Sequence, residues 1–319
     1  MSHFQTDIYL IHCLTPLHAG SGETNYGEID KLVQRDPTNH LPTIYSSALK
    51  GAIREFCEEF CKEENKPDMI AIFGGKGLDE KPEKEETPPK KEDSGKPAKQ
   101  SSKPGKCRFF SADLLCLPVQ GLKNPYFLTT SASVLAEMNQ KMEALGAAKD
   151  ALNSAKISQE IAVLTAEMQN AGTSAAKKEE IEEDIKALEK NKQELELFQW
   201  NTAVSADAED LNYEIKGKKL TTSCLAGSEV YLVSEDDFCQ NIAKNLPVIA
   251  RNHLDNGESK NLWYEEIVPR ESRFVFAVAA PTKEASLLQT LKEYINGTTI
   301  HIGAHASIGY GYCKITKLN

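Results

Sequence analysis

The stretch that decides the fold is residues 14–56, which read LTPLHAGSGETNYGEIDKLVQRDPTNHLPTIYSSALKGAIREF. The apolar segment at residues 8–14 predicts a β-strand, and the Gly-Ser-Gly run at residues 20–22 predicts a loop after it. Asp30 follows as a lone acid with apolar residues nearby. The order strand, glycine-rich loop and carboxylate places an acidic group on a loop that a ligand can approach.

The end of this stretch predicts a helix from residue 48 to about residue 64, with Ser46 and Ser47 as its N-terminal cap. Its apolar side chains recur at helical spacing, and they are Leu49, Ile53 and Phe56. Lys50 and Arg54 lie one helical step apart on another face. Two cations near an acidic loop are suited to a phosphodiester, which needs charge to hold it and an acid group close by.

Several linked motifs in this stretch resemble a known family. They are L-T-P-L-H-x-G-S-G, G-x-I-D, V-Q-R and S-x-L-K-G-x-I-R, in that order. The chain resembles the RAMP superfamily, and within it the backbone subunits of Cmr (type III-B) CRISPR effector complexes. Two later segments fit the same resemblance: residues 263–269 resemble the segment after the family's thumb, and residues 302–311 resemble its carboxy-terminal glycine-rich loop.

Size and composition indicate an ordinary globular protein. The chain has 319 residues, of which 40% are hydrophobic, enough for one large or two ordinary domains. It shows neither an apolar run long enough to span a bilayer nor a secretion signal, so we expect a cytoplasmic protein without membrane contact. The eight cysteines form no C-x-x-C pair. Cys57 and Cys61 could ligate a metal only if further ligands joined them, and a reduced, scattered set is the favoured interpretation.

The net charge of −10 has the wrong sign for nucleic-acid binding by bulk electrostatics. Two explanations stay open for RNA binding: the excess acid lies in appended elements, or binding uses a local cationic groove. We do not expect a continuous basic face.

The order of predicted elements indicates an α+β fold with helices on one face of an antiparallel sheet. This agrees with the RRM-like (ferredoxin-like) palm that the resemblance implies, formed by residues 1–73, 107–131 and 201–319. A β-hairpin near residues 242–266, turning at residues 255–257, is the thumb by resemblance.

Two segments interrupt this palm. Residues 74–106 are rich in Lys, Glu, Pro and Ser and predict a disordered charged loop. A basic RNA-binding arm at residues 96–106 is the alternative there. Residues 132–200 predict an inserted helical hairpin that packs along its own apolar stripe, or else an arm that docks a partner.

Asp30 is the predicted catalytic residue and metal ligand. Cleavage of RNA by its own 2′-hydroxyl needs in-line geometry, removal of a proton and stabilisation of phosphate charge. A single carboxylate is enough to hold a hydrated Mg²⁺ or another divalent cation. An Asp in such a loop is ordinarily a turn former, but the resemblance gives Asp30 the position of the cleaving aspartate.

The other predicted site residues surround this centre. His18 is either a proton shuttle or a side chain that holds the loop through a backbone hydrogen bond. Arg35, Lys50 and Arg54, together with Arg251 of the thumb, are the candidates for guide-RNA phosphates. Gly303, Gly309 and Gly311 would allow close approach of the RNA to the backbone, or would simply form a tight turn.

The resemblance implies a metal-dependent RNA endonuclease that works inside a multi-subunit complex. Its expected partners are guide RNA, single-stranded target RNA, other Cmr subunits and further copies of itself in a head-to-tail filament. One alternative is a subunit that holds guide RNA without cleaving. Another is a stand-alone, metal-independent nuclease that processes guide precursors with His18 or His305.

Overall fold

The computed structural model describes residues 3–22, 27–75, 103–122, 124–145, 203–221 and 229–318, with isolated helical residues between 164 and 186. The predicted charged loop lies almost wholly outside these residues, as does most of the predicted helical hairpin. The division into palm, loop and insertion therefore stays a prediction.

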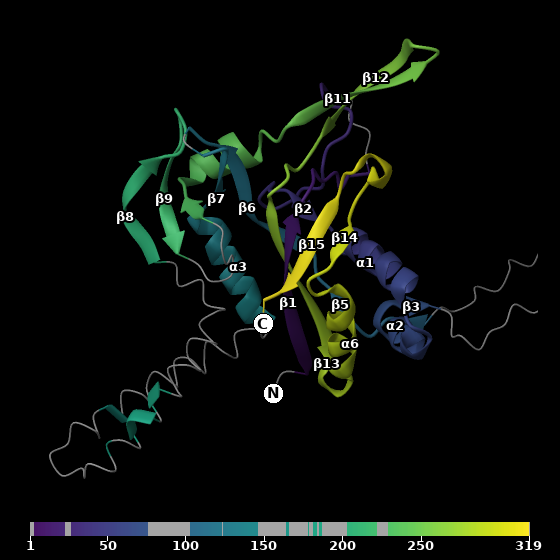
Figure 1. Cartoon of the computed structure of the whole chain (residues 1–319), viewed down its shortest axis with the longest axis vertical. Helices are drawn as coiled ribbons and strands as arrows, with labels where there is room; N and C mark the ends of the chain where they lie inside the picture. Colours follow the sequence, from purple (N-terminus) through teal and green to yellow (C-terminus); the bar gives the residue numbers. More distant parts are fainter. Residues whose placement is uncertain are drawn as a thin grey trace, which may run out of the picture.

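One 11-stranded sheet organises the molecule (Figure 1). Its main path runs β14-β15-β1-β13-β6-β7-β10-β9-β8, with β2 beside β6 and β5 beside β13. The strands are β1 Phe4–Cys13, β2 Thr43–Ile44, β5 Arg108–Phe109, β6 Ala112–Gln120, β7 Tyr126–Thr130, β8 Ala203–Asp210, β9 Lys216–Thr221, β10 Val230–Leu232, β13 Arg273–Pro281, β14 Thr299–His301 and β15 Tyr312–Lys317. Because β10 runs parallel to β7, the sheet is mixed, and the expectation of a purely antiparallel sheet is wrong.

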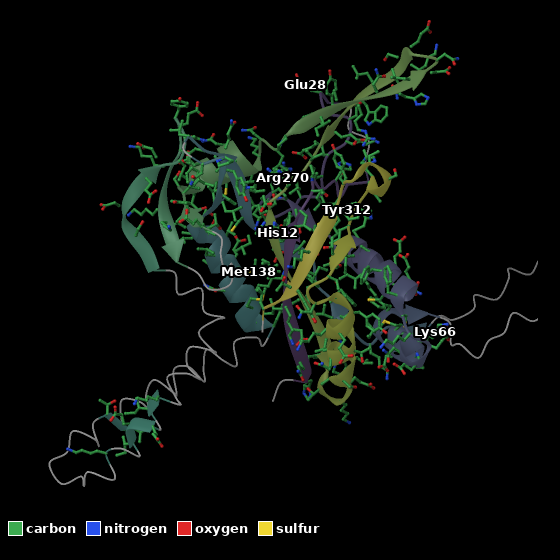
Figure 2. All side chains as sticks on the ribbon, viewed as in Figure 1. His12, Glu28, Lys66, Met138, Arg270 and Tyr312 are labelled. Carbon is green, nitrogen blue, oxygen red and sulfur yellow. The ribbon has the colours of Figure 1, made fainter. Side chains whose placement is uncertain are left out.

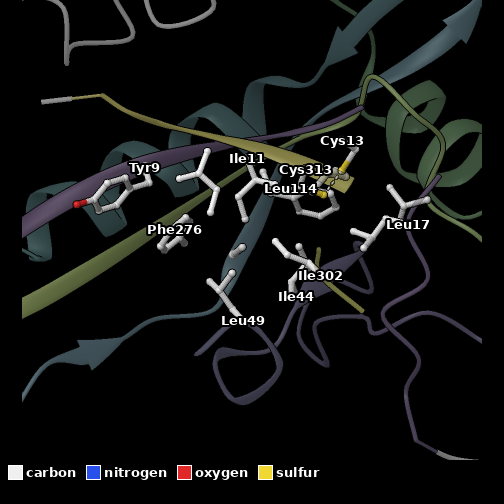
Figure 3. Close-up of a cluster of buried hydrophobic side chains, with 14 of the residues drawn as sticks. Tyr9, Ile11, Cys13, Leu17, Ile44, Leu49, Leu114, Phe276, Ile302 and Cys313 are labelled. Carbon is white, nitrogen blue, oxygen red and sulfur yellow. Dashed lines mark hydrogen bonds between the residues drawn. The ribbon is translucent and has the colours of Figure 1, made fainter. Parts of the chain in front are cut away.

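Helices cover both faces of the sheet. They are α1 Ser46–Phe60, α2 Lys66–Phe73, α3 Ala132–Ala144 and α6 Ser286–Ile295. On one face, α1, α2 and α6 pack over Tyr9 and Ile11 of β1, in the cluster drawn in Figure 3. On the other, α3 packs over Ile8 and Leu10. The α+β class is confirmed, but the expectation of helices on one face is wrong, because β1 is apolar on both sides and each side needs cover.

The central strand explains this arrangement. Residues alternate sides along β1, so its continuous apolar run supplies two cores instead of one. The strand pairs antiparallel with β13 and with β15. Cys13 and Cys313 are register partners across β1 and β15, and both are buried free thiols whose sulfurs lie 3.8 Å apart.

The predicted hairpin is present as a separate two-stranded sheet of β11 Val248–Asp255 and β12 Glu258–Glu266. Asn256 and Gly257 form its turn with φ values of 52° and 85°, the left-handed conformation that an Asn-Gly hairpin turn adopts. Figure 1 shows the hairpin projecting away from the body of the molecule. Most of its side chains are exposed, so its outer half rests on no other described element.

The smaller elements refine the sequence predictions. Helix α1 begins at Ser46 with Tyr45 as its N-cap and no side-chain capping bond, so the predicted serine cap is wrong. The Ser46 N–H donates instead to Ser111 Oγ, 3.2 Å away. The remaining pieces are the 3-10 turns Glu63–Asn65, Thr282–Glu284 and Ala306–Ile308, the π-helix Asp237–Ala243, and the paired strands β3 Gly74–Gly75 and β4 Lys103–Pro104. Among the described residues, no helix has the length and apolar character needed to cross a membrane.

Candidate functional site

The candidate site lies at the root of the hairpin, where residues 30–33 run along the end of β12. The backbone N–H groups of Asp30 and Lys31 donate to the Tyr264 carbonyl at 3.1 and 3.2 Å. The Glu266 N–H donates in return to the Lys31 carbonyl at 2.9 Å. These bonds fix the acidic loop against the hairpin, so two segments far apart in sequence form one surface.

Asp30 is held by the hairpin backbone and is partly exposed. Its Oδ2 accepts a hydrogen bond of 2.8 Å from the Tyr264 N–H. The structure records no bond to Oδ1 among the described residues. The carboxylate therefore has a fixed orientation, and its roles in cleavage and metal binding stay predictions.

Glu265 is the most heavily contacted acid of the site, and its side chain is only 1% exposed. Its carboxylate accepts from Trp263 Nε1 at 2.6 Å, from Lys31 Nζ at 2.9 Å and from Arg251 Nη1 at 3.3 Å. Lys31 and Arg251 also lie over the Trp263 ring, 5.3 and 5.8 Å from its centroid. One buried carboxylate thus holds two cations and an indole in place at the root.

The charge on Glu265 is strongly stabilised. Burial raises the pKa of Glu265, but the hydrogen bonds from Trp263 and Lys31 and the charge of Lys31 outweigh that effect and lower the pKa to about 2. His305 Nε2 lies 3.0 Å from this carboxylate, and burial lowers the pKa of His305 although the charge of Glu265 raises it.

Glu266 points to the opposite side of β12 and anchors Arg35. Its Oε1 lies 2.5 Å from Arg35 Nη2, and its Oε2 accepts from the Val33 N–H at 3.1 Å. Arg35 Nη1 also donates to the carbonyls of His40 and Ala243 at 2.9 Å each. These contacts occupy Arg35 in tying the loop to the body of the fold, and its predicted phosphate contact stays a prediction.

His18 is buried beneath the loop, with 3% of its surface exposed. Its Nδ1 lies 2.7 Å from the Glu266 carbonyl, to which it donates. The rings of His18 and His305 lie 5.7 Å apart. This geometry matches the loop-holding interpretation of His18, while its role as a proton shuttle stays a prediction.

The three predicted glycines differ in what they face. All have positive φ, the conformation that favours glycine. A Cβ on Gly303 would lie 2.5 Å from the His18 carbonyl oxygen, and one on Gly311 would collide with the Ile302 carbonyl. At Gly309 it would meet open space. Gly303 and Gly311 are thus required by close backbone packing, and of the three only Gly309 faces the open space that a ligand needs.

Lys50 and Arg54 are not brought to the hairpin root. Arg54 Nε donates to Glu58 on the same helix at 2.6 Å, and Lys50 Nζ lies 5.8 Å from the Phe109 ring centroid. Among the described residues, neither contacts Asp30, Glu265 or Glu266. The two cations lie on α1 and not at the hairpin root. RNA binding by them stays a prediction.

The side chains at the root do not form a closed metal site. Among the described residues, no group of three His, Cys, Asp or Glu side chains could hold a metal ion. Mg²⁺ commonly keeps several waters and binds one or two carboxylates together with substrate phosphates. Among the described residues, Asp30 Oδ1 accepts no hydrogen bond. A single carboxylate of this kind fits a site where waters and phosphates supply the other ligands.

Sequence reasoning gave no role to Lys31, Glu265 or Glu266. In sequence they read as ordinary strand-end charges. A usable signal is that two adjacent acids at the end of a strand point to opposite sides, so at least one must face the protein. That acid then needs a cationic partner, and Lys31, Arg35 and Arg251 are such partners.

Comparison with known proteins identifies the family. The profile of the RAMP superfamily matches residues 10–314. The CRISPR system Cmr endoribonuclease Cmr4 of Pyrococcus furiosus is 24% identical over 96% of this chain and 93% of its own length. The CRISPR system CMR subunit Cmr4 of Saccharolobus solfataricus is 40% identical, over 24% of this chain and 23% of its own length.

Solved structures share the fold. A type III-B Cmr-beta complex bound to cognate target RNA contains a chain with a TM-score of 0.60 and 18% identity, covering 99% of both chains. Oligomeric Cmr4 from Pyrococcus furiosus aligns with a TM-score of 0.56 and 16% identity over 100% of both chains. With the profile match over most of its length, this chain belongs to the RAMP superfamily.

Proposed function

We propose that this chain is the target-cleaving backbone subunit of a type III-B CRISPR ribonucleoprotein. It would bind guide RNA as repeated head-to-tail copies and cut complementary target RNA at regular intervals, with Asp30 at the cleavage site. The observation that carries the proposal is the setting of Asp30, an oriented and partly exposed carboxylate at the root of a projecting hairpin. The near full-length similarity to an endoribonuclease supports it.

The topology supports an RRM-like (ferredoxin-like) palm for this function. The central strands lie in the order β15-β1-β13-β6, with α1 between β1 and β6 in the chain and α6 between β13 and β15. That is a βαββαβ arrangement. The hairpin leaves this palm as the proposed thumb, and the site lies where the two join.

The residues at the root have separate proposed tasks. Asp30, oriented by the Tyr264 N–H, would act on the ribose–phosphate linkage. Lys31 and Arg251 would attract phosphates, because Glu265 and Trp263 hold both cations in place beside the loop. His18 would keep the loop in position through its bond to the Glu266 carbonyl. A preformed arrangement of this kind costs little reorganisation when the substrate binds.

A divalent cation is part of the proposal, and Asp30 is the residue that would hold it together with RNA phosphates. When bound, the cation would stabilise negative charge that develops on the phosphate. We therefore expect target cleavage by the complex to stop in EDTA and to return when Mg²⁺ is restored.

The test is Asp30→Asn in the complex reconstituted with guide RNA. Asparagine keeps an oxygen for the Tyr264 N–H but removes the charge, so assembly and target binding should persist. We expect target cleavage to fall at least about 100-fold. Glu28→Gln is the matched control, because Glu28 is an exposed carboxylate on the same loop, near the hairpin in Figure 2.

The outcome separates the proposal from its alternatives. If the Asp30→Asn complex cleaves target RNA at the full rate, the remaining interpretation is a subunit that holds guide RNA without cleaving. Cleavage of guide precursors by the isolated chain in EDTA would instead favour acid–base chemistry by His18 or His305, whose rings lie close together.

A further inference from the structure

Among the described residues, only part of the α3 side of the main sheet is covered by a helix. Along β1, Ile8 and Leu10 are buried under α3, but His12, the next residue on that side, is partly exposed. Figure 2 shows His12 and Tyr312 on the sheet above Met138 of α3, with Arg270 in the turn before β13. The uncovered part carries polar and aromatic side chains where the covered part carries aliphatic ones.

Strand register shows which residues share this uncovered part. Lys314 of β15 is the register partner of His12 on β1, and His12 is the partner of Arg273 on β13. Tyr312 lies two residues from Lys314 and therefore on the same side, paired with His301 of β14. We call this surface the open face, and its exposed members used below are Tyr312, Lys314, Arg270 and Tyr126.

The open face carries cations that the described residues neutralise only weakly or not at all. Glu271 lies 2.9 Å from His12 and 3.3 Å from Arg273, so its charge is already engaged. Arg270 is 62% exposed and lies only within 3.8 Å of the same carboxylate. Exposed Lys314 has no recorded ion pair among the described residues. In a chain of net charge −10, this is a local site for an anion.

Aromatic rings accompany these cations. Tyr312 is 39% exposed and lies edge-on to the His301 ring, 5.8 Å between centroids. Tyr126 of β7 is 36% exposed, and its hydroxyl lies beside the Glu271 carboxylate that also contacts His12 and Arg273. Exposed rings on a sheet beside exposed cations suit single-stranded nucleic acid, whose bases stack on rings while its phosphates meet the charges. An acidic protein segment would use the cations but would leave the rings without a stacking partner.

We propose that the open face binds single-stranded RNA, with bases stacked on Tyr312 and Tyr126 and phosphates held by Lys314 and Arg270. The choice of RNA rests on the proposed function. The surface continues into the candidate site, because the Tyr312 carbonyl accepts from the Leu14 and Thr15 N–H groups at the start of the loop that carries His18. A strand leaving the hairpin root therefore has a second place to bind.

The experiment uses the full chain, freed of bound RNA, and a single-stranded RNA of about 12 nucleotides that carries a photoreactive uridine analogue. We expect crosslinks on peptides that contain Tyr312 or Tyr126. Tyr312→Ala should weaken binding about fivefold or more, while Tyr312→Phe should stay within about twofold of the parent. Arg270→Ala with Lys314→Ala should reduce the slope of log affinity against log salt by about 1.4.

Lys283→Ala is the matched control, because Lys283 is an exposed lysine beyond the opposite end of β13. It should leave affinity and slope unchanged. Circular dichroism of each variant must show the parent's unfolding temperature, and Tyr312→Phe keeps the test valid if Tyr312→Ala is unstable.

Three results would overturn the proposal. They are no RNA binding by the chain, crosslinks confined to the hairpin and the loop at residues 14–22, and unchanged affinity in the open-face variants. If the variants alter only self-association in sedimentation, the open face is an interface between copies. Cleavage by the Asp30→Asn complex would remove the proposed function without affecting crosslinks at Tyr312, so the two failures are distinguishable.

Discussion

The hairpin root and the open face both carry charged and aromatic residues, but they use them differently. At the root, Glu265 and Glu266 are buried and each holds cations in fixed positions. On the open face, Arg270 and Lys314 point to solvent with little or no compensation.

The comparison shows that a cation's environment decides its role. Arg35 resembles a phosphate ligand in sequence, yet its guanidinium is occupied by Glu266 and two backbone carbonyls. Arg270 occupies no motif, yet it is free to meet a ligand. The following predictions distinguish the charged residues that stabilise the hairpin root from the exposed cations of the open face.

The largest effect is expected at Glu266. Glu266→Ala removes the partner of Arg35 and the acceptor of the Val33 N–H, leaving a largely buried cation uncompensated. We expect the free energy of unfolding to fall by about 3–5 kcal/mol. Urea denaturation measures this free energy. A loss below about 1 kcal/mol would mean that the Glu266–Arg35 pair does not stabilise the fold.

Glu265 should contribute a pH-dependent share of the stability. Its folded pKa of about 2 lies below the usual value of 4.5. The stabilisation is therefore complete above about pH 4.5 and is lost as pH falls through about 2. Glu265→Gln should cost about 3 kcal/mol at pH 7 and much less near pH 2. Denaturant titrations of both proteins across this range measure the difference, and a cost independent of pH would contradict it.

The glycine-rich loop offers a matched pair. Gly303→Ala places a Cβ 2.5 Å from the His18 carbonyl oxygen, whereas Gly309→Ala meets open space at a similar φ. We expect losses of about 3 kcal/mol and about 1 kcal/mol in the free energy of unfolding. Equal losses would show that His18 does not pack against Gly303 as described.

The smallest effects are expected on the open face. Arg270→Ala and Lys314→Ala should each change the free energy of unfolding by no more than about 0.5 kcal/mol, because both side chains are exposed and the ion pair of Arg270 with Glu271 is long, at 3.8 Å. Thermal unfolding of both variants checks this. A loss comparable to that of Glu266→Ala would erase the distinction between the two regions.

Sequence patterns predicted the elements better than their assembly. The hairpin was predictable because Asn256 and Gly257 specify its turn. The strand at β13 was predictable from its continuous apolar run, and the helix at α6 from its apolar periodicity. Periodicity does not say what a helix packs against, and so α3, predicted as the start of a separate helical hairpin, was not predicted to cover the main sheet.

The site was predictable only in part. The motif order identified Asp30 and the loop around it, which the structure places at the hairpin root. It also grouped Lys50 and Arg54 with Asp30, because residues close in sequence were taken as close in space. Glu265 and Glu266 were given no role, since their partners Lys31 and Arg35 lie more than 200 residues away in the chain.

The position of β1 has a consequence for synthesis of the protein. This strand lies in the middle of the sheet, and its two neighbours, β13 and β15, come from the far end of the chain. A nascent chain on the ribosome must therefore carry an apolar strand with both edges unpaired until those neighbours emerge. Folding with such high contact order is slow, and the waiting strand is a natural client for chaperones.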